Sequence, residues 1–205
     1  LGNLGAGSSA TQLNHLVDKW FLGADHPTDA GLNYVSACGS LFVGGPSHWD
    51  MRQGALGDCY FIAALGSIAD NSPAAIHNMF VYNGDNTWTV RFYVNGTADY
   101  VTVDRMLPVN YSSRFVFSNY GGYAYSASNE LWIALAEKAY AQWNETGNEG
   151  RDGQNSYYSI AGGWMSTVYS QVLGKWAGSY STYYNSNSTV LANAMRNRWA
   201  VTIGT

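Results

Sequence analysis

Charged residues are scarce in this chain of 205 residues. Asp, Glu, Lys and Arg together make up 12% of it, with 10 basic against 14 acidic side chains. The formal charge of -4 argues against a nucleic-acid surface, because such a surface needs a basic patch. No apolar run approaches the roughly 18 residues that a membrane-spanning helix requires. We therefore expect a soluble protein with no nucleic-acid partner and no membrane span.

Cysteine is scarce as well. The sequence contains Cys38 and Cys59 and no others, so it lacks the framework of a disulfide-stabilised domain. It also lacks an initiator methionine and a signal peptide at Leu1, and we expect it to be a processed or trimmed piece. Secretion, or membership of a larger processed protein, stays open. The length suffices for one large or two small domains.

Local patterns predict a mixture of helices and strands. Apolar spacing of three and four residues predicts amphipathic helices, and alternation predicts strands. An Asn95-Gly96 turn signal joins two of these strands into an antiparallel hairpin. Ser128 is the predicted N-cap of the third long helix. The predicted helices span 11–22, 59–70, 129–143 and 188–197, with a short helix or turn at 73–80; the predicted strands span 87–94, 100–104, 116–117 and 199–203; residues 28–50 are predicted to be irregular.

The most informative stretch is residues 53–65, which begins with Gln53 and contains Cys59. Cys59 opens an apolar run with helical spacing, and unpaired N–H groups at a helix N-terminus favour a thiolate. Gly54 and Gly57 permit a tight loop between the glutamine and the cysteine. The Gln53 amide and the Cys59 backbone N–H would then face one developing oxyanion. This arrangement suits acyl transfer through a thioester.

The alternative interpretation is that Cys59 is a buried small hydrophobe, which is the commoner role of a cysteine in an apolar run. The glutamine, the glycines and the helix start favour the nucleophile. Burial of the Cys59 side chain would contradict a role as the nucleophile.

The segment Gln-Gly-Ala-Leu-Gly-Asp-Cys-Tyr at 53–60 resembles the active-site segment of the calpain family of papain-like cysteine proteases. Leu56 and Asp58 distinguish it from the papain segment. Tyr60 departs from the family, which commonly has tryptophan there. Three further segments, 103–108, 129–141 and 156–163, resemble calpain segments in the same order. The resemblance covers roughly residues 40 to 165.

The resemblance implies site residues by position. Cys59 matches the nucleophile and Gln53 the oxyanion glutamine. Gly162 and Gly163 match a cleft loop whose backbone pairs with an extended polypeptide substrate. The family also binds calcium in this lobe, through oxygen ligands that suit a hard cation. The matching positions are the Val43 and Gly45 carbonyls and the Asp50 and Glu130 carboxylates. Asp50 as a loop cap and Glu130 as a first-turn helix carboxylate are the alternatives.

A thiol protease needs a histidine base, and the sequence supplies none at the expected place. In papain-like enzymes the histidine follows the cysteine by roughly 130–150 residues, yet residues 189–205 contain no histidine. The four histidines are His15, His26, His48 and His77, of which His48 is the one local rival because it lies near Gln53. The prediction is that the chain ends between two lobes, and that the remaining lobe, as a second chain or segment, supplies the histidine and an asparagine.

The predicted fold is α+β, a calpain-like core that is mostly the helical cysteine lobe with a small antiparallel sheet, the second lobe being largely absent. The predicted boundaries are 1–30 for an N-terminal helical segment, 31–197 for the cysteine lobe and 198–205 for the start of the second lobe. The predicted function is a cysteine endopeptidase whose fragment alone is inactive. A catalytically silent module, used for binding or scaffolding, is the alternative, and an acyltransferase using the same thioester is a third reading.

Overall fold

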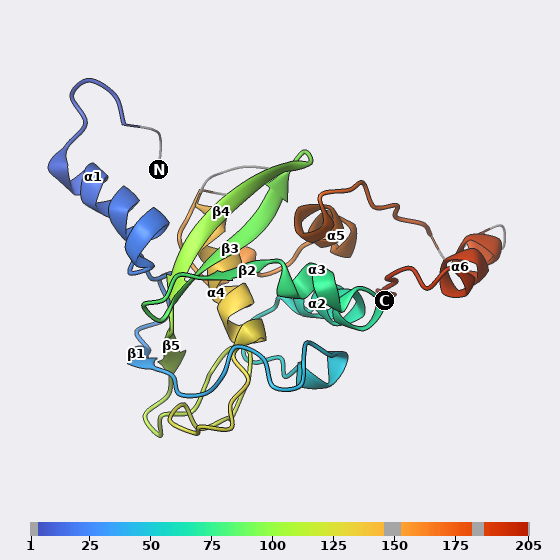
Figure 1. The fold of residues 1–205 in the computed structure, drawn as a ribbon, viewed down its shortest axis with the longest axis horizontal. Coiled ribbons are helices and arrows are strands. Elements are labelled where there is room, and N and C mark those ends of the chain that lie inside the picture. Colours follow the sequence, from blue (N-terminus) through green and yellow to red (C-terminus); the bar gives the residue numbers. More distant parts are fainter. Residues whose placement is uncertain (1–3, 146–152, 182–186, 205) are drawn as a thin grey trace.

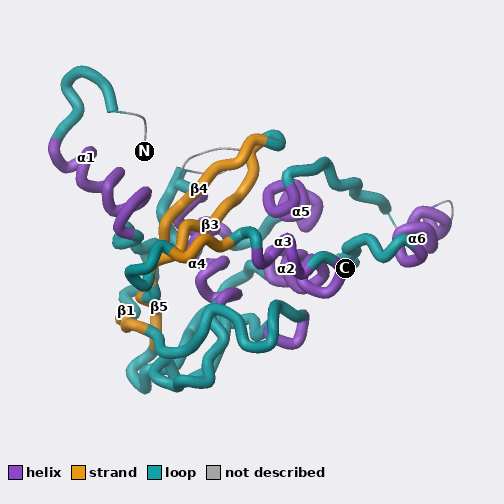
Figure 2. The backbone as a smooth tube through the Cα atoms, viewed as in Figure 1, coloured by secondary structure: helices purple, strands orange, loops and turns teal. Residues whose placement is uncertain are grey.

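The computed structural model describes residues 4–145, 153–181 and 187–204 (Figure 1). Residues 1–3 and 205, which belong to the predicted terminal segments, lie outside this range. Helices and strands are both present (Figure 2), which confirms the α+β class. Within the described residues, none of the helices combines the length and the apolar character needed to cross a bilayer.

The first helix is α1, Ala10–Val17, which continues as a π-helical turn, η1, over Asp18–Leu22. The Ser9 hydroxyl accepts a hydrogen bond from the Gln12 N–H and caps the start. Gly23 ends the helix with φ of 65°, a left-handed conformation that glycine adopts without strain. The helix predicted over 11–22 is therefore confirmed.

The cysteine helix is α2, Cys59–Asn71, and α3, Pro73–His77, follows it after a break at Ser72. Both agree with the sequence pattern. Two later helices are α5, Met165–Leu173, which the sequence analysis missed, and α6, Asn187–Arg196, which it predicted. Helix α2 packs against α3 and α5.

The fourth helix, α4, spans Trp132–Asn144 and begins three residues later than predicted. Its N-cap is Leu131, so the prediction of a Ser128 cap was wrong. The reason is backbone pairing with a distant segment. The Asn129 carbonyl accepts from the Ser40 N–H, and the Leu131 N–H donates to the Ser40 carbonyl. These bonds, which flank the isolated bridge from Ser40 to Glu130, hold residues 129 and 130 outside the helix.

The larger sheet has three antiparallel strands in the order β2-β3-β4, with bounds Phe80–Tyr82, Thr87–Val94 and Thr97–Asp104. Asn95 and Gly96 both have positive φ, 51° and 79°, in the turn between β3 and β4. The predicted hairpin is thus confirmed, although β4 begins earlier than predicted. A second sheet pairs β1, Asn33–Ser36, with β5, Met106–Val109.

Two strand predictions were wrong. Residues 116–117 form no strand, because strand pairing in this stretch is limited to two isolated bridges before them, from Phe115 to Val109 and from Arg114 to Tyr123. Residues 199–203 are irregular rather than a strand. The Val201 carbonyl accepts its hydrogen bond from the Ser67 hydroxyl of α2 instead of from a neighbouring strand. Strands β1, β2 and β5 were not predicted.

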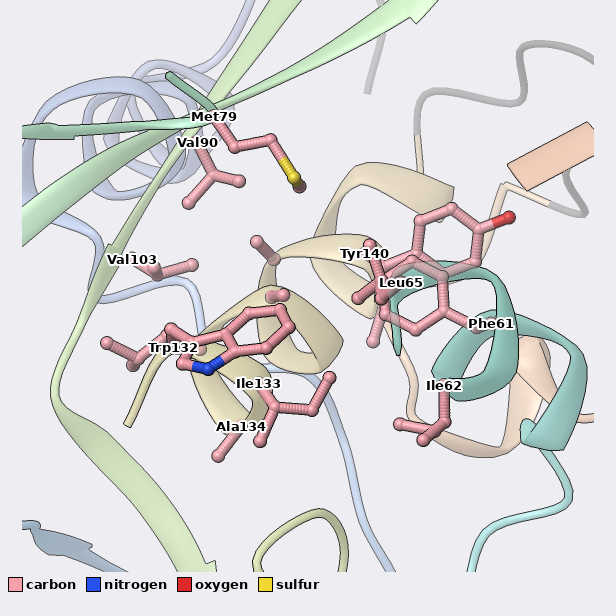
Figure 3. Close-up of a cluster of buried hydrophobic side chains, with 14 of the residues drawn as sticks. Phe61, Ile62, Leu65, Met79, Val90, Val103, Trp132, Ile133, Ala134 and Tyr140 are labelled. Atoms are coloured by element: carbon pink, nitrogen blue, oxygen red, sulfur yellow. The ribbon is translucent and has the colours of Figure 1, made fainter. Parts of the chain in front are cut away.

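The hydrophobic core gathers side chains from α2, α4 and the three-stranded sheet (Figure 3). Phe61 of α2 stacks on Tyr140 of α4 with ring centroids 4.1 Å apart, and Phe92 of β3 stacks on Trp143 at 4.7 Å. All 13 residues of α4 are buried. Burying one large apolar side chain contributes about 1.5–3 kcal/mol. Helix α4 is therefore the rigid centre against which the cysteine helix is positioned.

Candidate active site

Cys59 is the first residue of α2, and its side chain is exposed. The preceding residue, Asp58, is the N-cap, and its carbonyl accepts hydrogen bonds from the Phe61 and Ile62 N–H groups at 2.8 and 3.2 Å. The first N–H groups of a helix have no partner within the helix, and the helix dipole there favours a negative charge. The alternative of a buried, hydrophobic Cys59 does not hold. Cys59 and Cys38 are both free thiols.

Gln53 faces the same hollow as Cys59. This open hollow has a volume of about 400 Å³ and runs along one side of α2. The Gln53 side-chain N–H donates a hydrogen bond of 2.8 Å to the Leu56 carbonyl, which fixes the amide over its own loop. An amide nitrogen carries two hydrogens, so this bond uses one of them. The lining residues are His48, Met51, Gln53, Cys59, Ile62, Ala63, Gly66 and Ser67.

The loop between Gln53 and Cys59 packs closely on the segment at 116–117. A Cβ atom at Gly54 would lie 2.2 Å from the Val116 carbonyl oxygen, so only glycine fits there. The Ala55 N–H donates to that same carbonyl at 3.0 Å. The glycine is therefore required by close backbone approach, and it sets where the loop begins.

The loop at Gly162 and Gly163 lies directly beside the cysteine loop. The Gly162 N–H donates a hydrogen bond of 2.8 Å to the Gly57 carbonyl. A Cβ atom at Gly163 would lie 2.4 Å from the Tyr60 ring. The Tyr60 hydroxyl donates to the Ile160 carbonyl at 3.0 Å, so this tyrosine anchors the loop by both its ring and its hydroxyl. The structure thus brings together two motifs about a hundred residues apart.

His48 is the only one of the four histidines, all of which are described, that lines the hollow. Its Nδ1 lies 2.5 Å from the Asp70 Oδ2, and its backbone N–H donates to the Asp70 Oδ1 at 3.1 Å. Burial acts to raise the pKa of Asp70, but the hydrogen bonds from His48 outweigh it and lower that pKa. His26 instead pairs with Asp104, and His77 packs on Phe42.

Of the four predicted calcium ligands, Val43 and Gly45 lie on one loop, Asp50 ends the following 3-10 turn, and Glu130 lies two residues before α4. The Val43 N–H donates to the Glu130 Oε1 at 2.8 Å, which joins the loop to Glu130. Asp50 Oδ2 accepts from the Ser47 N–H at 2.8 Å and from the Trp132 indole N–H at 2.9 Å. Asp50 therefore does cap a loop turn, as the alternative had it. Glu130 precedes α4, so it is not a first-turn helix carboxylate.

The electrostatics of these two carboxylates fit a cation. Burial raises the pKa of Glu130, and the negative charge of Asp50 raises it further. The hydrogen bonds given above use one oxygen of each carboxylate. Gly45 has φ of 101°, a left-handed conformation that glycine adopts without strain. The part of the chain described here holds no cluster of three or more His, Cys, Asp or Glu side chains suited to a metal. A site of two carboxylates and carbonyl oxygens is of the kind that calcium takes.

The sequence did not predict a role for Asp70, the partner of His48, or for Glu137. Glu137 of α4 is buried beneath the cysteine loop and contacts Asp58. A charged residue between apolar positions of a helix normally marks a solvated face, so no sequence signal distinguished Glu137 from a surface residue.

Residues 33–203 match the family described as Calpain family cysteine protease. The chain is similar to calpain-type cysteine protease DEK1 of Zea mays, with 31% identity over 130 residues, 62% of this chain and 6% of the relative. It is similar to calpain-8 of Mus musculus, with 32% identity over 151 residues, 71% of this chain and 18% of the relative. It is also similar to calpain clp-4 of Caenorhabditis elegans, with 36% identity over 119 residues, which are 55% of this chain and 16% of the relative. The chain thus spans a small part of these relatives.

Proposed function

Because the chain belongs to the calpain family of cysteine proteases, we propose that it is the cysteine-bearing lobe of a papain-like endopeptidase core. The observation that carries the proposal is the exposed Cys59 thiol at the start of α2, in one hollow with the Gln53 amide. A thiol placed at a helix N-terminus beside an amide donor suits attack on a carbonyl carbon. Residues 198–204 would lead into the second lobe.

In the proposed reaction the Cys59 thiolate attacks the carbonyl carbon of a peptide bond and forms a C–S bond. The Gln53 side-chain N–H and the Cys59 backbone N–H hold the oxyanion that develops on the carbonyl oxygen. The C–N bond then breaks, and the leaving amine takes the proton that the thiol gave up. Water hydrolyses the thioester, which releases the carboxylic acid and returns the thiol.

The proton carrier in this scheme is a histidine of the second lobe, oriented by an asparagine, as in papain-like enzymes. The local alternative is His48, since its ring lines the hollow and its Nδ1 is held by Asp70. Nothing else in the described chain offers an imidazole at the hollow. If His48 is the base, the chain alone should cleave peptides. If the base lies in the second lobe, cleavage should require that lobe.

The substrate is proposed to be an extended polypeptide lying along Gly162 and Gly163. Both glycines are exposed, and their loop is fixed to the cysteine loop through Gly57 and Tyr60. Backbone pairing with an extended chain gives affinity without reading most side chains. A polypeptide held there would present one of its carbonyl groups to Cys59.

Calcium is proposed to bind between the Val43 and Gly45 carbonyls and the Asp50 and Glu130 carboxylates. The cation would neutralise two carboxylates that repel each other and would tie the loop ahead of Gln53 to the start of α4. Its role here would be to order the loop, with no part in bond making.

The test compares the chain alone with the chain plus the remaining protease segment, using cleavage of an unstructured protein and labelling by a peptide with an electrophilic warhead. We expect negligible turnover by the chain alone, and turnover with labelling at Cys59 when the two are combined. Cys59→Ala should abolish both, while Cys38→Ala should abolish neither.

Two results would contradict the proposal. Robust cleavage by the chain alone, lost in His48→Ala, would place the base at His48 and remove the need for a second lobe. Absence of Cys59 labelling in the combined protein would favour a silent, binding role for this fold.

A further inference from the structure

Two buried carboxyl groups lie directly behind the nucleophile. Asp58, which immediately precedes Cys59, has 0% of its surface exposed, and Glu137 of α4 has 1%. The two carboxyl groups lie close enough for each to shift the pKa of the other. Acidic residues are seldom fully buried unless a partner compensates their charge. This pair therefore requires an explanation that the reaction chemistry of Cys59 and Gln53 does not provide.

Glu137 contacts one end of the loop that carries the site directly, and it reaches the other end through the segment at 116–118. At one end it meets the Asp58 side chain. At the other, its Oε2 accepts a hydrogen bond of 2.9 Å from the Ser118 N–H. Ser118 follows the segment whose Val116 carbonyl receives the Ala55 N–H. A single side chain of the rigid helix α4 thus supports the loop next to Gln53 and next to Cys59.

The hydrogen bonds of the pair balance only if it holds a proton. Both oxygens of Asp58 and the Oε1 of Glu137 are buried without a donor from the described residues. Two ionised carboxylates can only accept, so neither supplies the other with a hydrogen. One proton converts either group into a hydroxyl donor and turns the contact into a charge-assisted hydrogen bond.

Among the residues that the structure describes, no cation compensates the charge of the pair. Glu137 lines a small cavity of about 10 Å³ with Ser118 and Tyr157, the other walls being apolar. Tyr157 is itself fully buried, and the Glu137 charge helps to raise the pKa of its hydroxyl, after burial and Tyr34. The groups that act on Glu137 are Asp58 and Ser118, and those that act on Asp58 are Glu137 and its own backbone.

We propose that Asp58 and Glu137 share one proton at neutral pH, and that Glu137 is thereby a positioning residue which holds the Gln53–Cys59 loop in its reactive geometry. The positioning role rests on the proposed peptidase function, whereas the shared proton does not. With one proton, the buried pair carries a single negative charge next to Cys59 rather than two. Two charges would repel each other and would oppose a thiolate at the next residue.

The pKa directions agree with this arrangement. Burial raises the pKa of Asp58 to about 6, against the opposing effect of its hydrogen bond with Glu137. Burial, and then the charge of Asp58, raise the pKa of Glu137 well above its usual range. An acid whose pKa is raised on folding contributes stability that is complete at low pH and is lost as the pH rises through the folded value.

The test uses the full chain with Glu137→Gln, Asp58→Asn and, as a matched loss of a carboxylate on the exposed turn before β3, Asp85→Asn. In Glu137→Gln the amide N–H donates to Asp58 while its oxygen still accepts from Ser118. We expect wild type and Asp85→Asn to show the infrared carbonyl band of a protonated carboxylic acid at neutral pH. Glu137→Gln and Asp58→Asn should both lack that band.

Stability supplies the second readout. As the pH rises from about 5 to about 9, the melting temperature of the wild type should fall relative to that of Glu137→Gln, because only the wild type loses the shared proton. Asp85→Asn should follow the wild type. In the assembled protease, peptide turnover should survive Glu137→Gln within about threefold and fall roughly 100-fold in Glu137→Leu, because small displacements of reacting groups are costly.

Each arm has an outcome that overturns the proposal. Absence of the carboxylic acid band in the wild type, or its persistence in Glu137→Gln, removes the shared proton. Equal turnover of Glu137→Leu and wild type removes the positioning role, and if that variant does not fold, a large loss in Glu137→Gln does the same. The infrared and melting measurements need no catalysis. Absence of peptidase activity would therefore refute the proposed function, while these two measurements would still decide whether the proton is shared.

Discussion

The Gly162 N–H donates a hydrogen bond of 2.8 Å to the Gly57 carbonyl, and this bond joins the cleft loop to the loop that carries the nucleophile. Gly163 lies against the ring of Tyr60, which is the residue that follows Cys59. The position of a bound polypeptide relative to the thiol is therefore set by backbone and by one aromatic ring. A side chain introduced here acts on the geometry of both loops.

Gly163→Ala should destabilise the chain and displace the cleft loop. Its Cβ atom would lie 2.4 Å from Tyr60, and overpacking of this kind costs about 1–3 kcal/mol. Chemical denaturation measures the stability, and the KM for a peptide substrate reports the loop. Gly5→Ala is the control, because no atom lies within 4 Å of that Cβ position. Indistinguishable denaturation midpoints for the two variants would refute the packing argument.

Gln53→Ala should lower kcat of the assembled protease while leaving KM almost unchanged. The Gln53 N–H that is not bound to the Leu56 carbonyl acts on the oxyanion of the transition state, and one such donor is worth roughly 100- to 1,000-fold in kcat. Steady-state kinetics with a peptide substrate measure the effect. Gln12→Ala on α1 is the control for the same substitution outside the hollow. A rise in KM with unchanged kcat would show that Gln53 binds substrate instead.

Calcium should raise the melting temperature of the wild-type chain, and Glu130→Gln or Asp50→Asn should remove that rise. A cation bound only by the folded state stabilises it by about 2.7 kcal/mol at a hundred times its Kd. Melting curves with added calcium and with a chelator measure the difference. Asp85→Asn controls for loss of a carboxylate elsewhere. The same calcium response in Glu130→Gln as in wild type would place the ion at another site.

Asp104→Asn should destabilise the chain at neutral pH and weaken its acid sensitivity. Burial acts to raise the pKa of Asp104, but His26 and Lys138 outweigh it and hold that pKa below its usual range. The stabilisation is therefore present above about pH 4 and is lost as the pH falls through the folded pKa. Lys138, with 0% of its side chain exposed, would lose its carboxylate partner at a cost of about 3 kcal/mol.

Denaturant unfolding between about pH 3 and about pH 7 checks this prediction, because the difference between wild type and Asp104→Asn should shrink as the pH falls. Asp18→Asn on η1 is a matched control away from Asp104, His26 and Lys138. A constant difference across this range would show that Asp104 acts by packing rather than by its charge.

Local sequence patterns predicted the elements whose signals lie within a dozen residues. The apolar run after Cys59 gave α2, and Asn95-Gly96 gave the β3-β4 hairpin. Strands β1, β2 and β5 were missed because each has three or four residues, too few for a clear alternation, and β1 pairs with β5 some seventy residues away. The alternation at 199–203 resembled a strand, but the chain there finds a helix hydroxyl instead of a strand partner.

The site divides in the same way. Cys59 and Gln53 were predicted because loop and helix signals coincide within seven residues. Both line one hollow, and their catalytic roles stay a prediction. Glu137 and Asp70 were not predicted, because each contributes to the site through a partner that lies elsewhere in the sequence, Asp58 for Glu137 and His48 for Asp70. A carboxylate on a helix reads as solvated unless the opposite face of that helix is also known to be covered.

The complete burial of α4 has a consequence for how the molecule opens. Local opening exposes the least covered segments first, and α4 has no uncovered side from which to fray. Its amide hydrogens should therefore exchange with solvent only in the global transition, long after those of α1 and α6. The loop of Cys59 packs on α4 and should therefore open less often than its exposure alone suggests. The exposed thiol is thus supported by the segment that we expect to unfold last.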